Sequence, residues 1–98
     1  SKGITGMFSG KYSEYDLNSK ICSHINLFCD TKRLDANISE VVVTEVPVDT
    51  YYIIVEVYCE NPGKLIGIKG KTSTKLANEL SLLADCKLEL NILPNKTK

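Results

Sequence analysis

Tryptophan, paired histidines and CxxC motifs are all missing from this sequence. Its single histidine excludes a metal site made of several histidines, and its four cysteines lack the close spacing of zinc ligands. No apolar run approaches the roughly 18 residues that a membrane-spanning helix needs. Residues 1–6 contain no apolar stretch of the kind found in signal peptides. We therefore expect no metal, no membrane partner and a cytoplasmic location.

Motifs for catalysis are missing as well. No serine, cysteine or aspartate stands in a nucleophile motif, and His24 borders an expected apolar stripe, where a structural role fits better. Residues 70–72 imitate the end of a Walker A motif, but its first glycine would have to be residue 65, which is a leucine. The cysteines fall on apolar faces, as is typical of buried, reduced thiols in an intracellular protein; they are Cys22, Cys29, Cys59 and Cys86. The sequence thus predicts a protein that is not an enzyme and holds no cofactor.

Charge is balanced over the whole chain but unevenly distributed along it. The 12 basic and 12 acidic residues give a formal net charge of zero. Residues 61–78 nevertheless carry four lysines and no acid, whereas residues 34–60 carry six acids and no base. We expect this separation to make one small surface basic on an otherwise neutral protein.

The hydrophobic pattern predicts a single α+β domain over residues 13–98, preceded by a flexible arm at residues 1–12 that is rich in glycine and serine. The expected order is helix, strand, strand, short helix, helix, strand. These elements are expected at residues 14 to about 34, 39–46, 51–59, 62 to about 67, about 72–84 and 87–93. A short turn joins the first two strands and a helical pair separates the last two. We therefore expect a three-stranded mixed sheet with the helices packed on one face.

Side-chain spacing and capping residues support these boundaries. Residues expected to face the core are Leu17, Ile21, Ile25 and Phe28 in the first helix, Ile53, Val55, Val57 and Cys59 in the second strand, and Leu76, Leu80 and Leu83 in the last helix. Asn61 is expected to cap the short helix, and Pro62 suits its first turn. Gly67 can end that helix, and Thr72 or Ser73 can cap the next one.

The loop between the two helices has the features of a phosphate-binding site. Gly67 and Gly70 have no side chain, so a nucleic-acid backbone can approach the loop closely. The next helix begins just past them, and its free N–H groups and dipole favour an anion. Lys69 and Lys71 add positive charge at the same place. Bases would be read elsewhere, in a groove floored by Ile66 and bordered by the last strand, which suits an unpaired strand.

The same residues resemble a known family. Asn61-Pro62-Gly63, the run GKLIGIKGK at residues 63–71 and the run ADCKLELNI at residues 84–92 are similar to KH domains of the type II order, over residues 38–93. This resemblance extends to ribosomal and small standalone bacterial members, and the neutral charge favours a standalone module. It implies that the domain binds about four nucleotides of single-stranded RNA or DNA without catalysing a reaction. The clamp it implies comprises Gly67, Ile68, Lys69 and Gly70, with supporting charges at Lys64, Lys71 and Lys75 and an apolar groove residue at Ile66.

Two other functions fit parts of the sequence. A KH fold could serve as a protein-interaction or dimerisation module with weak or no RNA binding, and the acidic residues 34–60 and the extra N-terminal helix would suit a homodimer or protein partner. A helix-turn-helix protein that binds duplex DNA fits less well. Its first helix would be too short, and its second carries Lys75 but no arginine to read guanine.

Overall fold

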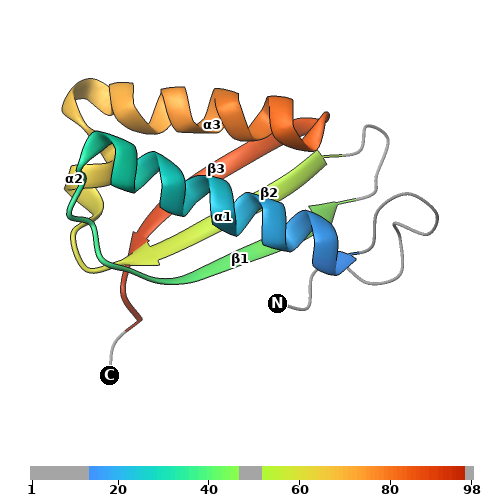
Figure 1. Cartoon of the computed structure of the whole chain (residues 1–98), viewed down its shortest axis with the longest axis horizontal. Helices are drawn as coiled ribbons and strands as arrows, with labels where there is room; N and C mark the ends of the chain where they lie inside the picture. The colour runs from blue at the N-terminus through green and yellow to red at the C-terminus, as the bar shows by residue number, and fades with distance from the viewer. Residues whose placement is uncertain (1–13, 47–51, 97–98) are drawn as a thin grey trace.

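The computed structural model describes residues 14–46 and 52–96. The predicted arm at residues 1–12 and the predicted turn at residues 47–50 lie outside the described residues. In chain order the elements are α1 (Glu14–Lys32), β1 (Ile38–Val46), β2 (Tyr52–Cys59), α2 (Pro62–Ile66), the 3-10 turn η1 (Ile68–Gly70), α3 (Lys71–Ala84) and β3 (Lys87–Pro94) (Figure 1). The predicted order of elements is confirmed.

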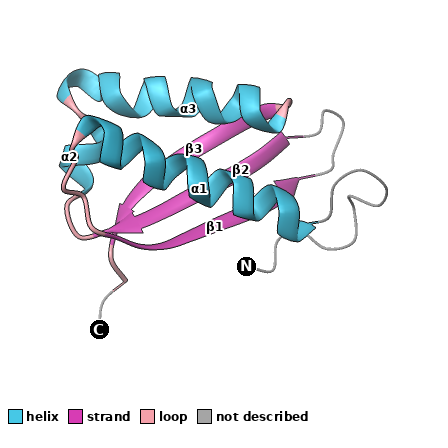
Figure 2. Cartoon of the chain, viewed as in Figure 1, coloured by secondary structure: helices cyan, strands magenta, loops and turns pink. Residues whose placement is uncertain are grey.

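The sheet has the strand order β1-β2-β3. β1 pairs with β2 in antiparallel register, with Val43 opposite Val55, whereas β2 and β3 are parallel, with Val55 opposite Leu90. The long helices α1 and α3 lie side by side over one face of this sheet (Figure 2). The predicted three-stranded mixed sheet with helices on one face is therefore confirmed.

The core lies between the two long helices and the sheet. In β2 every second side chain is buried, because successive side chains of a strand point to opposite faces and only one face is covered by helices. The predicted stripe of α1 is also buried, from Leu17 to Phe28. No polar or charged side chain is buried within the described part of the chain. The core is thus held together by apolar packing. The periodic apolar residues seen in the sequence form the buried faces of the helices and strands.

The predicted core position of Leu83 is wrong, since this side chain is 40% exposed. Leu83 lies in the last turn of α3 and borders a groove whose opposite wall on α1 includes the small residues Ser19 and Ser23. These short side chains leave the space above Leu83 open. Leu76 and Leu80, which face the sheet, are fully buried as predicted.

The predicted side-chain caps are also wrong, although Pro62 does begin α2 and Gly67 does follow its end. Asn61 makes no cap hydrogen bond, because its Nδ2 donates instead to the carbonyl of Asp35 at 2.9 Å. At α3 the N-cap is Gly70, so the helix begins at Lys71, before the predicted caps. Ser73 lies inside the helix, where its Oγ donates to the Gly70 carbonyl at 3.2 Å.

Candidate nucleic-acid interface

Two glycines with positive φ shape the loop between α2 and α3. Gly67 has φ 78° and ψ 177°, and Gly70 has φ 72° and ψ 13°. A side chain at Gly67 would also collide with Thr72, because its Cβ would lie 2.7 Å from the Thr72 Cβ. At Gly70 the nearest atom to an added Cβ would be the Ser73 Oγ, at 3.9 Å. A glycine is thus needed at position 67 both because a side chain would not fit and because φ is positive there. At position 70 it is needed only because φ is positive.

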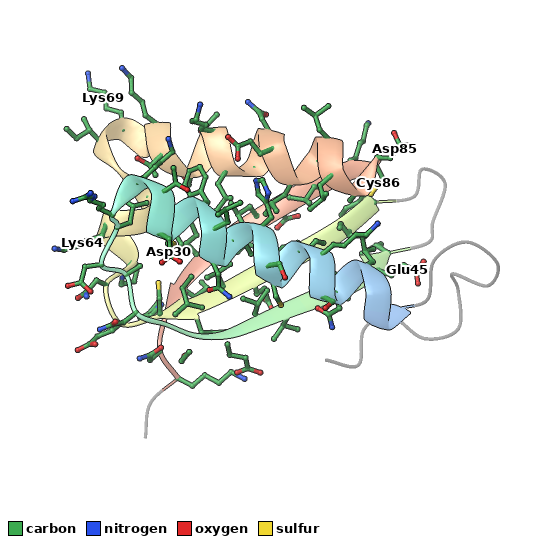
Figure 3. All side chains as sticks on the ribbon, viewed as in Figure 1. Asp30, Glu45, Lys64, Lys69, Asp85 and Cys86 are labelled. Atoms are coloured by element: carbon green, nitrogen blue, oxygen red, sulfur yellow. The ribbon has the colours of Figure 1, made fainter. Side chains whose placement is uncertain are left out.

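The two residues between these glycines project into solvent. Ile68 is 79% exposed. Lys69 has φ 55° and ψ 29°, a left-handed conformation that costs a lysine about 1–2 kcal/mol. Its side chain extends away from the body of the protein (Figure 3). Both glycines are half-exposed, and the side chain of Thr72 covers part of Gly67.

The loop leads directly into the N-terminus of α3. This helix spans 14 residues, its N-cap makes no side-chain hydrogen bond, and its first turn contains no acid. The N–H groups of Gly70 and Lys71 donate to the carbonyls of Gly67 and Ile68, so the attraction for an anion here comes mainly from the partial positive charge of the helix dipole. The start of α3 can therefore accept an anion beside the glycine loop.

Four exposed lysines surround the loop, as the sequence predicted from their positions along the chain; they are Lys64, Lys69, Lys71 and Lys75. Lys64 projects from α2 at the same end of the molecule as Lys69 (Figure 3). In the described ranges 14–46 and 52–96, only Lys75 of these four forms an ion pair, with its Nζ 3.9 Å from Glu79 Oε2. Their charges are therefore almost entirely available to a ligand.

Ile66 and β3 border the loop on its other side. Ile66 is half-buried at the end of α2, and α2 contacts β3, an edge strand of the sheet. The Asn95 N–H donates to the Cys59 carbonyl at 3.0 Å, and alternate residues of a parallel strand bond to the same neighbour. By this alternation the backbone of Leu88, Leu90 and Ile92 faces the open edge, as does Pro94, which has no N–H to donate. The sequence predicts that the last strand borders the site but does not reveal which of its backbone groups face outward.

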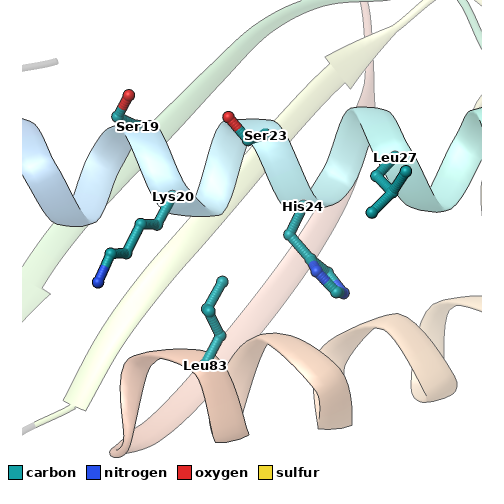
Figure 4. A pocket seen from close by; sticks show the side chains of 6 residues that line it. All are labelled: Ser19, Lys20, Ser23, His24, Leu27 and Leu83. Atoms are coloured by element: carbon teal, nitrogen blue, oxygen red, sulfur yellow. The ribbon is translucent and has the colours of Figure 1, made fainter.

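A second feature, absent from the sequence-based predictions, is a groove of about 400 Å³ between α1 and α3. It is lined by Ser19, Lys20, Ser23, His24, Leu27 and Leu83 (Figure 4). His24 Nε2 lies 2.7 Å from Glu79 Oε1 and joins the two helices. The exposed side chains of Leu27 and Leu82, at 61% and 82%, belong to these same two helices. The sequence carried one sign of this exposed apolar surface. Leu82 and Leu83 are adjacent near the end of α3, and only one of two adjacent helical residues can face the core.

The four cysteines are free thiols, and burial raises the pKa of each one above 9.0. For Cys29 the neighbouring Asp30 adds to this effect, and for Cys86 the carboxylates of Asp85 and Glu45 do the same. A raised pKa keeps a thiol protonated, and a thiol is a weaker nucleophile than a thiolate. The thiols therefore behave as small apolar groups at neutral pH.

Other kinds of site find no support in the described structure. Among residues 14–46 and 52–96, no three histidine, cysteine, aspartate or glutamate side chains gather where they could hold a metal ion. Within the same ranges, none of the helices has the length and apolar character required to cross a membrane. No family model matches the sequence, and no curated protein shows significant similarity to it. The function therefore has to be argued from the geometry of the loop and its surroundings.

Proposed function

We propose that this chain is a type II KH domain that binds single-stranded nucleic acid, RNA in particular, without catalysing a reaction. The observation that carries the proposal is the loop at residues 67–70, where two positive-φ glycines flank the exposed residues Ile68 and Lys69 and precede a helix start that has no side-chain cap. The element order and the parallel pairing of β2 with β3 support the same assignment, since they match the type II order expected from the sequence.

Phosphate groups would be held by the loop and the start of α3. The backbone at Gly70 leaves room for close approach, whereas Thr72 fills the space beside Gly67. The N-terminus of α3 adds partial positive charge next to Gly70. Lys69 and Lys71 lie on either side of Gly70 and contribute full charges. These contacts fix the position of the strand but carry no information on its sequence.

Bases would be read between α2 and the edge of β3. Ile66 offers an apolar surface, and the outward backbone groups of Leu90 and Ile92, toward the end of β3 that lies near α2, can hydrogen-bond to base edges. In a duplex the Watson–Crick edges are already paired, so this arrangement selects unpaired nucleotides. The absence of a stacking aromatic residue from the stretch 61–78 is consistent with recognition by hydrogen bonds.

The double substitution Ile68→Asp with Lys69→Asp tests this proposal. Both side chains are exposed, so the fold should survive, whereas two carboxylates would face the phosphates. We expect the affinity for a cyanine-labelled 12-nucleotide RNA to fall by about tenfold or more. Fluorescence anisotropy measures the affinity, and circular dichroism checks the fold.

A matched control makes the same change in net charge at another place. Leu82→Asp with Lys87→Asp also replaces an exposed apolar residue and an exposed lysine, near the other end of α3. We expect this control to retain most of its affinity for the same RNA. If the loop variant binds as well as the unmodified chain, or if both variants lose affinity equally, the loop is not the binding site.

A second candidate function is protein interaction through the outer surface of α1 and α3. The exposed leucines Leu27, Leu82 and Leu83 and the groove beside them favour it, since exposed apolar patches often mark interfaces. Size-exclusion chromatography with and without RNA separates the two functions. A stable dimer that ignores RNA would support interaction, and a monomer that shifts with RNA would support nucleic-acid binding.

A further inference from the structure

The strand β1 forms the edge of the sheet opposite to β3 (Figure 1). Within the part of the chain that the structure describes, β1 pairs with β2 and with no other strand. It spans nine residues, Ile38–Val46, and contains no proline. The outer side of an edge strand carries a row of N–H and C=O groups to which an added strand can bond.

The pairing of β2 determines which residues of β1 direct their backbone groups toward this edge. The Cys59 carbonyl accepts a hydrogen bond from the segment that follows β3, so Cys59 and every second residue before it bond to β3. The residues between them, such as Glu56, bond to β1, and Glu56 lies opposite Val42. Val42 therefore bonds to β2, whereas its neighbours Val41 and Val43 direct their N–H and C=O groups outward.

A groove of about 200 Å³ lies at the start of this edge, between the end of α1 and the start of β1. Its lining includes Asn26, Asp30, Asp35 and Ile38. Asn26 lies about 200° around α1 from His24, which faces α3, so the groove is on the side of α1 turned away from α3. Among the described residues that line the groove there is no lysine or arginine, and both aspartates are exposed. The groove therefore suits a positively charged side chain.

The charged residues of β1 itself have the same sign. They are Glu40 and Glu45, and the strand contains no base. Lys96 Nζ lies 3.4 Å from Glu40 Oε1, but these two side chains are 62% and 49% exposed, so water and salt screen the pair. The edge and its groove thus favour a basic ligand over an acidic one such as nucleic acid.

We propose that β1 binds an extended, lysine- or arginine-rich segment of a partner protein, which adds a strand to the sheet and places a basic side chain in the groove beside Asp30 and Asp35. Main-chain hydrogen bonds to Val41 and Val43 hold the segment, and the carboxylates select its charge. The proposed nucleic-acid site lies at the other edge of the sheet, along β3, so the two ligands bind without competing.

A fluorescein-labelled peptide of nine residues, alternating lysine and valine, tests this proposal. We expect its fluorescence anisotropy to rise and saturate as the chain is added. The same peptide with N-methyl groups on two consecutive central residues should bind at least about tenfold more weakly, because both of its edges then lose an N–H donor. No binding of the first peptide, or equal binding of the two, would overturn the proposal.

The substitution Val41→Pro tests the edge from the side of the protein. It removes an outward N–H group and leaves the bonds to β2 in place, and proline is tolerated at such positions of edge strands. We expect the affinity for the unmethylated peptide to fall by at least about tenfold. The matched control Leu90→Pro removes an outward N–H group from β3 and should leave the affinity unchanged. An equal loss in both variants, or no loss in Val41→Pro, would overturn the proposal.

A pair of charge-matched variants tests the groove. Asp30→Asn with Asp35→Asn removes both carboxylates and should weaken binding of the same peptide by about two- to tenfold, as expected for exposed ion pairs. Asp85→Asn with Glu89→Gln removes two exposed carboxylates near the start of β3 and should change the affinity little. Equal losses in the two variants would mean that net charge, and not the groove, attracts the peptide.

Two further measurements separate this proposal from the others. Circular dichroism checks that each variant is folded, and if Val41→Pro does not fold, the comparison of the two peptides still decides. Size-exclusion chromatography detects a second copy at the edge: a dimer that Val41→Pro converts to a monomer would overturn the choice of a basic partner. RNA binding without peptide binding would refute this proposal alone, and peptide binding without RNA binding would refute the proposed function alone.

Discussion

At the scale of single residues, Gly63 and Gly67 have different roles although they lie in the same stretch. Gly67 has positive φ and contacts Thr72, whereas Gly63 lies within α2 and has nothing within 4 Å of an added Cβ. We expect Gly67→Ala to lower the free energy of unfolding by about 1–3 kcal/mol, because alanine disfavours positive φ. Gly63→Ala should raise it by about 0.5–1 kcal/mol, because alanine favours a helix. Urea denaturation measures both, and equal effects would contradict the loop geometry.

Residue-level prediction from the sequence succeeded where the physical reason was local. Glycine was needed where α2 ends and the loop turns, and both positions have positive φ as such a turn requires. The cap predicted at Asn61 failed because its partner is distant in sequence: it bonds to Asp35, 26 residues away. The caps predicted at Thr72 or Ser73 failed because α3 begins earlier, at Lys71. The predicted core position of Leu83 was wrong because its exposure depends on which residues of α1 face it. The periodicity of α3 alone does not reveal those residues.

At the scale of elements, α1 is part of the core and not an appendage to the loop-bearing half. Ile25 on its inner face is fully buried, whereas Leu27, two residues away, is 61% exposed. We expect Ile25→Ala to cost about 2–5 kcal/mol of unfolding free energy, from lost burial and the cavity left behind. Leu27→Ala should change it by less than about 0.5 kcal/mol. Thermal or urea unfolding would contradict this placement if the two costs were similar.

The hydrophobic periodicity predicted the helices and strands. It did not predict which residues of β3 direct their backbone N–H and C=O groups toward the open edge of the sheet. The side chains of Leu88, Leu90 and Ile92 alternate along β3 and pack against the core. The direction of their backbone groups depends on pairing with β2, which is parallel and begins at Tyr52 opposite Lys87. Register between strands separated by two helices cannot be read from either strand alone. The half of the proposed site that would read bases therefore became visible only in three dimensions.

At the scale of the whole molecule, the lysines of residues 61–78 stay close to the loop, although Asp35 and Glu60 of the acidic stretch also lie beside the start of α2. Lys64 and Lys69 lie at the end of the molecule where α2 meets α3 (Figure 3), Lys71 and Lys75 lie near the start of α3, and all four are exposed. The formal net charge is zero, so the protein as a whole has no long-range attraction for a polyanion. Any affinity for nucleic acid must come from this local cluster.

Because the attraction for nucleic acid comes from a few lysines at the loop, we expect the binding affinity to depend only weakly on salt concentration. If about three phosphates are neutralised at the loop, the logarithm of the affinity should fall with the logarithm of salt concentration at a slope near −2, because each phosphate of a single strand contributes about −0.7. Lys71→Gln should reduce the slope by about 0.7. Lys87→Gln, which removes an exposed lysine at the start of β3, should leave it unchanged. Anisotropy titrations between about 50 and 200 mM salt measure the slope. A slope that responds equally to both substitutions would mean that the charge cluster at the loop does not hold the strand.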